Sequence, residues 1–155
     1  MDLEISPLAP KSFPQMPFVN GVRMATAKTE TKYKGRSDLL LIDLVSGTSV
    51  AGVLTKSTAP GHPVIWCRDK LQKGKARGLV VNAGNANVFN GKGGMQAVEA
   101  IAKSVGALLH CAKNEVYVAS TGVIGERLDP TKIVEKIATL KDDLQNQNWK
   151  DAAIA

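Results

Sequence analysis

Short apolar runs that alternate with two amphipathic helical segments constrain the fold of this chain most strongly. Residues 94–109 and 130–140 repeat apolar side chains at intervals of three and four, which places these side chains on one face of a helix. Pro130, directly after Asp129, adds a helix start signal. The remaining apolar runs have the length of β-strands. The pattern predicts one mixed α/β (α+β) domain with strands at residues 19–28, 37–45, 50–55, 64–67, 78–82 and 116–120.

Turn residues and prolines predict how neighbouring strands pair and what conformation the N-terminal residues adopt. Ser46-Gly47-Thr48 separates the second and third predicted strands, so a hairpin is the simplest arrangement. The run at residues 37–45 is nearly all apolar and is expected to be buried on both faces. Four prolines within residues 1–18 predict an extended N-terminal arm, because each proline disfavours helix in the residue before it. The domain is then expected to occupy residues 19–155.

Composition excludes several classes of protein. A chain of 155 residues with 44% apolar and 22% charged residues matches one globular domain. Its net charge of +6 is spread along the sequence, and only 5% of residues are aromatic, which disfavours binding of single-stranded nucleic acid. No apolar run reaches the length of a membrane span. Two cysteines, Cys67 and Cys111, form no disulfide framework and indicate a cytoplasmic location.

Common motifs for phosphate, metal and nucleophilic chemistry do not fit. The glycines around Gly91-Lys92-Gly93 have the wrong spacing for a phosphate loop and the wrong final residue for a dinucleotide fingerprint. His62, Cys67, His110 and Cys111 lack zinc-ligand spacing, so we interpret the histidines as structural. Ser120 has no glycine two positions before it and therefore does not form a nucleophile elbow.

Two polar, glycine-bearing segments remain, and each directly follows an apolar run. In the first, Asn82, Asn85 and Asn87 surround Gly84, a composition that suits either a structural turn or a loop that binds a polar ligand. In the second, Thr121 precedes Gly122. A hydroxyl followed by a glycine N–H supplies two donors for a developing oxyanion, although Thr-Gly is also a common turn.

These two segments lie within stretches that resemble the ornithine acetyltransferase family, the bifunctional glutamate N-acetyltransferases of arginine biosynthesis. The matching stretches are residues 76–87, Ala-Arg-Gly-Leu-Val-Val-Asn-Ala-Gly-Asn-Ala-Asn, and residues 119–128, Ala-Ser-Thr-Gly-Val-Ile-Gly-Glu-Arg-Leu. The similarity extends from about Val19 to Ala155. It implies a layered sandwich of the ornithine acetyltransferase type, similar to N-terminal-nucleophile folds, of which this chain would hold an incomplete part.

The resemblance also implies a reaction. In this family a precursor cleaves itself at an Ala-Thr bond, and the freed threonine transfers an acetyl group from N-acetylornithine to glutamate. Thr121 and Gly122 would form the oxyanion hole, and Asn82, Asn85 and Asn87 are candidate substrate-binding residues. No cofactor or metal is implied, and some members also accept acetyl-coenzyme A. The expected partners are the remaining α segment and the β chain, in a hetero-oligomer without nucleic acid or membrane.

The family's cleavage sequence, Met-Ala-Thr-Met-Leu, does not occur in the 155 residues. We therefore expect residues 19–155 to be a partial α-chain domain that lacks the nucleophilic threonine, and the isolated chain to be inactive. An inactive truncated remnant, a non-catalytic domain of the same fold and an N-terminal-nucleophile aminopeptidase are the alternatives. A segment with the cleavage sequence encoded downstream would favour the transferase.

Overall fold

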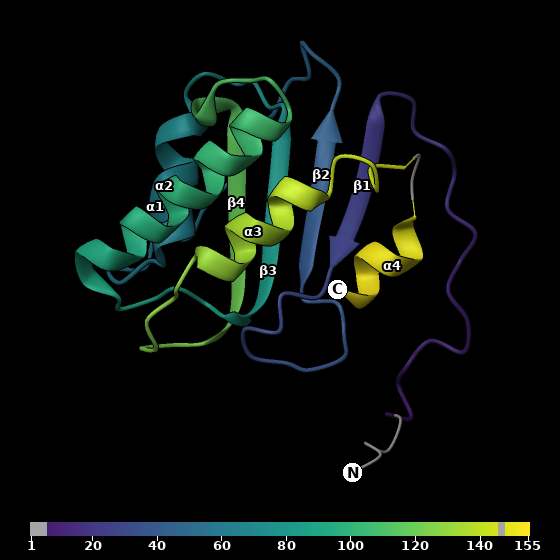
Figure 1. The fold of residues 1–155 in the computed structure, drawn as a ribbon, viewed down its shortest axis with the longest axis horizontal. Helices are drawn as coiled ribbons and strands as arrows, with labels where there is room; N and C mark the ends of the chain where they lie inside the picture. Colours follow the sequence, from purple (N-terminus) through teal and green to yellow (C-terminus); the bar gives the residue numbers. More distant parts are fainter. Residues whose placement is uncertain (1–5, 146–147) are drawn as a thin grey trace.

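The computed structural model describes residues 6–145 and 148–155 and shows a mixed α/β fold built on one four-stranded sheet. The strands lie in the order β1-β2-β3-β4 across the sheet (Figure 1). Antiparallel pairing joins β1 to β2 and β2 to β3, whereas β3 and β4 are parallel. The strands span Val22–Ala27, Leu39–Leu44, Gly78–Asn85 and Val116–Val123.

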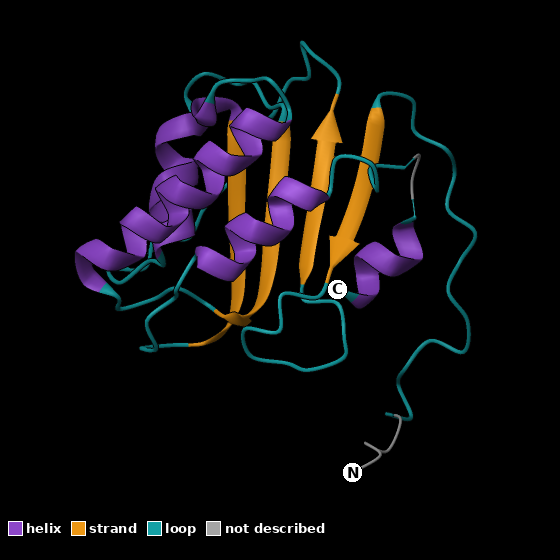
Figure 2. Ribbon diagram, in the orientation of Figure 1, coloured by secondary structure: helices purple, strands orange, loops and turns teal. Residues whose placement is uncertain are grey.

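Helices α2 and α3 pack against one face of the sheet (Figure 2). Helix α2, Gly91–Leu108, connects the parallel strands β3 and β4, and α3, Thr131–Thr139, lies beside it. Both helices were predicted from the spacing of their apolar residues and are confirmed, with shifts of a few residues at their ends. The shared core is almost entirely aliphatic and includes Leu39, Leu41, Val80, Val98, Ile101, Val105, Val116, Val118, Ile133, Ile137 and Leu140.

The predicted strand at residues 64–67 is wrong, because these residues lie in helix α1, His62–Leu71. A run of four apolar residues carries no period that distinguishes a strand from a helix. In the helix, the Trp66 indole N–H donates to the carbonyl oxygen of Val116 at 2.9 Å, and the Cys67 thiol donates to that of Val118 at 3.3 Å. Helix α1 therefore occupies the outer edge of β4, where an additional strand would pair.

The predicted strand at residues 50–55, and with it the hairpin, is also wrong. This segment forms no strand, and its neighbourhood contributes only an isolated bridge between Ser49 and Lys75. Strand β2 already pairs with β1 on one side and β3 on the other, so no edge remains for a third partner. Residues 50–54 instead run close to α1, where Gly52 approaches the Leu71 side chain.

Outside this sheet, two segments lie near β1. Residues 6–18 contain no helix or strand and run along the side of the molecule that carries β1 (Figure 1). The short helix α4, Trp149–Ile154, also contacts β1. A single 3₁₀ turn, Lys113–Glu115, precedes β4. No helix in the part of the chain that the structure describes is long and apolar enough to cross a membrane.

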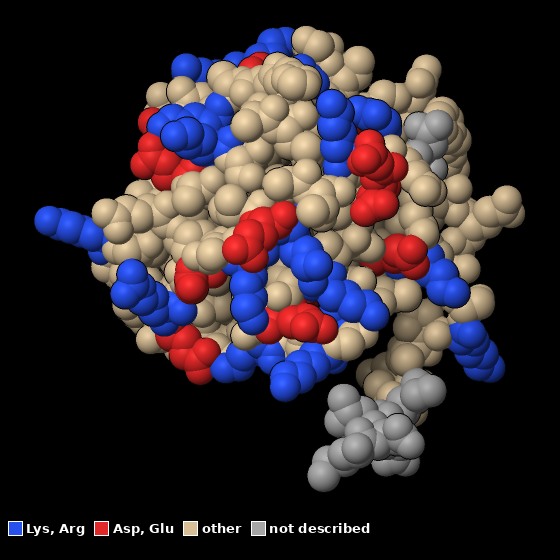
Figure 3. Space-filling model, viewed as in Figure 1, with Lys and Arg blue, Asp and Glu red and all other residues tan. Residues whose placement is uncertain are grey.

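Positive and negative side chains alternate over the face that carries α2 and α3 (Figure 3). Lys32 pairs with Glu126 at 2.8 Å, and Arg23 pairs with the buried Asp43 at 2.5 Å. Basic residues on this face thus have acidic neighbours, as expected for a solvated surface and unlike the single-sign patch that a polyanion would require.

Candidate active site

Strands β3 and β4 run in parallel to a common end, where both polar segments from the sequence come together. The register places Asn82 beside Ser120, Ala83 beside Thr121 and Gly84 beside Gly122. Both strands are longer than predicted, because regular pairing continues through the residues that their composition assigned to turns. Thr121 and Gly122 are exposed at the end of β4. The predicted oxyanion donors are therefore accessible to a reactant.

The two strand ends approach each other so closely that glycine is required. Gly122 has a φ of +129°, and a Cβ atom added there would lie 2.2 Å from the carbonyl carbon of Gly84. Gly84 has a φ of +107°, and a Cβ atom at this position would lie 2.8 Å from Cβ of Lys32. Side chains are disfavoured at both positions by conformation and by contact. Lys32 therefore packs directly against Gly84, and Gly84 packs directly against Gly122.

The three candidate asparagines make their hydrogen bonds within the chain. Asn82 is 4% exposed; its Oδ1 accepts from the Ser120 hydroxyl at 2.6 Å, and its Nδ2 donates to the carbonyl oxygen of Asn85. Asn85 donates from Nδ2 to the carbonyl oxygen of Glu126 at 3.0 Å and accepts from the N–H of Asn87 at 2.8 Å. Their predicted contact with substrate remains a prediction.

Asn87 is fully buried and anchors the start of α2. Its Nδ2 donates to the carbonyl oxygen of Gly94, and its Oδ1 accepts from Asn90. Its own carbonyl oxygen lies 2.9 Å from Nδ1 of His62, which fits the structural role that we assigned to this histidine. Among the residues that the structure describes, no group of three or more His, Cys, Asp or Glu side chains could hold a metal ion.

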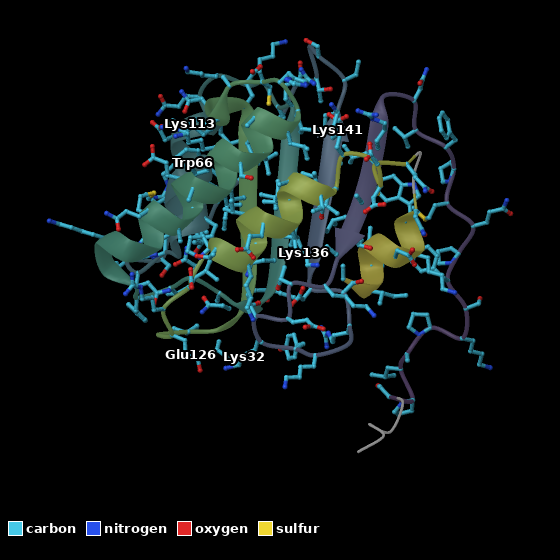
Figure 4. The ribbon with its side chains drawn as sticks, viewed as in Figure 1. Lys32, Trp66, Lys113, Glu126, Lys136 and Lys141 are labelled. Carbon is cyan, nitrogen blue, oxygen red and sulfur yellow. The ribbon has the colours of Figure 1, made fainter. Side chains whose placement is uncertain are left out.

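A polar strap, residues 29–36, lies over Gly84 beside the candidate site. The buried Asp38 accepts from the N–H and the hydroxyl of Thr29 and fixes one end of the strap. Lys32 reaches Glu126 from the strap to the segment after β4, and Figure 4 shows these two side chains at the same edge of the molecule. The sequence gives no signal for this pairing, because the two residues are 94 positions apart.

The opposite side of the sheet carries an apolar groove of about 440 Å³. Leu79, Tyr117 and Ala119 line it from the sheet, and α1 and residues 50–52 and 54 also line it. Burial raises the pKa of the Cys67 thiol, which also faces this groove. Ser120, the residue before Thr121, belongs to the lining as well. The groove thus extends to the residue that precedes the candidate oxyanion donors.

Comparison with known proteins places these features in a family. The model of the ArgJ family matches residues 23–155. This chain belongs to the ArgJ family. It is 52% identical over 159 residues to the arginine biosynthesis bifunctional protein ArgJ of Mesorhizobium japonicum and 48% identical over 155 residues to that of Bradyrhizobium diazoefficiens. Each alignment includes the whole chain but only 38% of the relative. The chain thus spans well under half the length of these ArgJ proteins.

Solved structures confirm the fold. The ornithine acetyltransferase of Mycobacterium tuberculosis, determined with ornithine, superposes with a TM-score of 0.81 at 30% identity, over 88% of this chain and 74% of that one. ArgJ of Bacillus halodurans gives a TM-score of 0.73 at 29% identity, over 77% of this chain and 62% of that one. The mixed α/β architecture and the family predicted from the two motifs are therefore both confirmed.

Proposed function

We propose that this chain contributes the oxyanion hole of an ornithine acetyltransferase that moves an acetyl group from N-acetylornithine to glutamate in arginine biosynthesis. The observation that carries the proposal is the exposed Thr121-Gly122 pair at the end of β4, in a chain that is about half identical to ArgJ proteins. In the proposed reaction one amide is exchanged for another of similar energy. The reaction therefore requires no resident cofactor, and acetyl-coenzyme A would enter only as an alternative acetyl donor.

The chemistry follows from where negative charge develops. A threonine hydroxyl attacks the acetyl carbonyl of N-acetylornithine, and the carbonyl oxygen becomes an oxyanion. The hydroxyl of Thr121 and the N–H of Gly122 donate to this oxygen, which stabilises the tetrahedral intermediate. Collapse of the intermediate expels ornithine and leaves an acetylated threonine. The amine of glutamate then attacks the carbonyl carbon of the acetylated threonine, and the same donors stabilise the second oxyanion. Cleavage of the ester C–O bond releases N-acetylglutamate and returns the threonine hydroxyl with its proton.

The nucleophilic threonine is proposed to lie outside these 155 residues, on a β chain released by self-cleavage at an Ala-Thr bond. The short span of the chain relative to ArgJ proteins supports this arrangement. The apolar groove beside β4 supports it too, because such a surface suits a second protein layer. We further propose that the assembly is a hetero-oligomer and works in the cytoplasm, which agrees with the free thiols of Cys67 and Cys111.

The test compares the chain alone with an assembly. The chain is produced by itself and together with the part of the Mesorhizobium ArgJ protein that lies outside the matched region. Glutamate-dependent release of ornithine from N-acetylornithine is then measured. We expect no transfer by the chain alone and transfer by the assembly. Transfer by the chain alone would refute the external nucleophile, and an inactive, correctly assembled complex would refute the proposed reaction.

Within the active assembly, Thr121→Ala tests the oxyanion hole. Loss of one such donor is expected to lower kcat about 100- to 1000-fold. Because Thr121 is exposed, the free energy of unfolding should change by less than about 0.5 kcal/mol. Thr139→Ala, at the end of α3, removes the hydroxyl of another exposed threonine and should leave kcat unchanged. Equal rates for the two variants would exclude the role assigned to Thr121.

A further inference from the structure

Four hydrogen bonds tie the asparagine segment, residues 82–88 at and just after the end of β3, to residues 120–126 at and just after the end of β4. These bonds lie on both sides of Thr121-Gly122. Before the pair, the Ser120 hydroxyl donates to Asn82. After it, the Asn85 side chain donates to the carbonyl oxygen of Glu126. Two backbone bonds join residues 86 to 123 and 125 to 88, at 2.9 and 3.0 Å. The oxyanion donors are thus held between cross-links that come from a single neighbouring segment.

Asn82 and Asn85 each use one N–H donor and one acceptor site of the side-chain amide for bonds within the chain. For each amide, both the oxygen and the nitrogen already bond to groups of the chain. Asn82 is also 4% exposed, and a substrate would have to displace an internal partner in order to reach it. A buried amide that loses such a partner is destabilised by about 1 to 3 kcal/mol. Direct substrate binding by the buried Asn82 is therefore disfavoured, whereas for the half-buried Asn85 the separate effects on kcat and KM distinguish positioning from binding.

We propose that Asn82 and Asn85 are positioning residues that fix the direction of the Thr121 and Gly122 donors, and that Ser120 is the link through which Asn82 acts. This inference rests on the proposed function of the site. The absence of side chains at Gly84 and Gly122 lets the two strand ends approach closely, but glycine alone leaves the backbone free to rotate. The asparagine bonds restrict that rotation. Donors that are aimed in advance stabilise an oxyanion without reorganisation during the reaction.

The first measurement concerns the strand end itself. Amide hydrogen exchange is followed by mass spectrometry in the assembled protein for Asn85→Ala and Ser120→Ala. We expect faster exchange in peptides that cover residues 121–126 and unchanged exchange in β1 and β2. Asn114→Ala, in the turn at the opposite end of β4, makes the same amide-to-methyl change and should leave residues 121–126 unaffected. Unchanged exchange in both test variants would overturn the proposal.

The second measurement separates positioning from binding. Misplacing a catalytic group by about 1 Å costs up to roughly 100-fold in rate. We therefore expect kcat of the assembly to fall about 10- to 100-fold in both variants, with KM for N-acetylornithine and glutamate unchanged. Ser120→Thr keeps a hydroxyl and should restore most of the rate. A raised KM with unchanged kcat would instead assign the asparagines to substrate binding. If the unmodified assembly transfers no acetyl group, only the proposed function fails, because the exchange result does not depend on it.

Discussion

At the scale of single residues, the end of the β3–β4 pair depends on two side chains that are missing. Gly84 and Gly122 both have positive φ angles, and neither has space for a Cβ atom. Their contact brings the backbone of the asparagine segment against that of the Thr121 segment. The composition of both segments was compatible with ordinary turns, yet both positions are in paired strands. Glycine is therefore needed here because it lets two strands approach closely, and not because the chain reverses direction.

Two alanine substitutions should separate this role of glycine from its general effect on the chain. Gly84→Ala is expected to lower the free energy of unfolding by at least about 1 to 3 kcal/mol, because the new methyl group meets Lys32 in a disfavoured conformation. In α2, the new methyl group of Gly93→Ala has no neighbour within 4 Å, so this substitution should raise the free energy of unfolding by up to about 1 kcal/mol. Urea denaturation measures both. Equal effects would mean that the contact at Gly84 is relieved at little cost.

Residue-level reasoning singled out a pair of residues but not their neighbours in space. The structure places Thr121 and Gly122 at an exposed strand end, and their role as oxyanion donors stays a prediction. The bond between Asn82 and Ser120 joins residues 38 positions apart and depends on the register of β3 against β4. No spacing rule encodes such a register, because the two strands meet only after α2 has returned the chain to the sheet.

At the scale of elements, the regular spacing of apolar residues predicted the helices that cover the sheet. Short apolar runs, by contrast, gave wrong strand predictions. Helices α2 and α3 have apolar stripes long enough to fix their type. Residues 64–67 have no such stripe and were assigned to a strand. Their helix is stabilised by tertiary contacts, since Trp66 and Cys67 reach backbone carbonyl oxygens of β4. Such contacts are decided by the partner strand and are invisible in the run itself.

The bond from Trp66 to β4 gives a prediction for this element. Trp66→Phe keeps an aromatic ring but removes the indole N–H, which leaves the carbonyl oxygen of the buried Val116 without this donor. We expect the free energy of unfolding to fall by about 1 to 3 kcal/mol. Ile65→Ala, on the exposed side of α1, is the control and should have a smaller effect. A Trp66→Phe protein as stable as the parent would show that α1 holds the strand edge by packing alone.

At the scale of the whole molecule, the two faces of the sheet differ. Helices cover one face, whereas the other presents half-buried Leu40, Ile42, Leu79 and Val81 next to the apolar groove. A face of this kind is expected to favour association. Sedimentation velocity of the chain alone should therefore show concentration-dependent association or aggregation, and addition of the complementary ArgJ segment should suppress it. A monomer that unfolds cooperatively by itself would contradict this expectation.

Alkaline pH should destabilise the whole fold. Burial raises the pKa of Cys67, of Cys111 and of Tyr117, so the unfolded chain releases these protons at lower pH than the folded one. The stabilisation is complete below the ordinary thiol pKa of 9.0 and is lost as the pH rises through the raised values. Denaturation at about pH 8 and pH 10 measures the fall, which should be shallower for Cys67→Ser. A fall of the same size in that variant would exclude a contribution from Cys67.

Helix α1 beside β4 and helix α4 beside β1 limit extension of the sheet at both edges. Indole and thiol donors engage carbonyl oxygens on the outer side of β4, while on the outer side of β1 the described residues contribute one bridge, between Met24 and Gln145. A strand supplied by another polypeptide would have to displace α1 in order to pair with β4, or α4 and the bridge at Met24 in order to pair with β1. A second chain is therefore expected to cover the apolar face of the sheet instead of continuing the sheet at an edge.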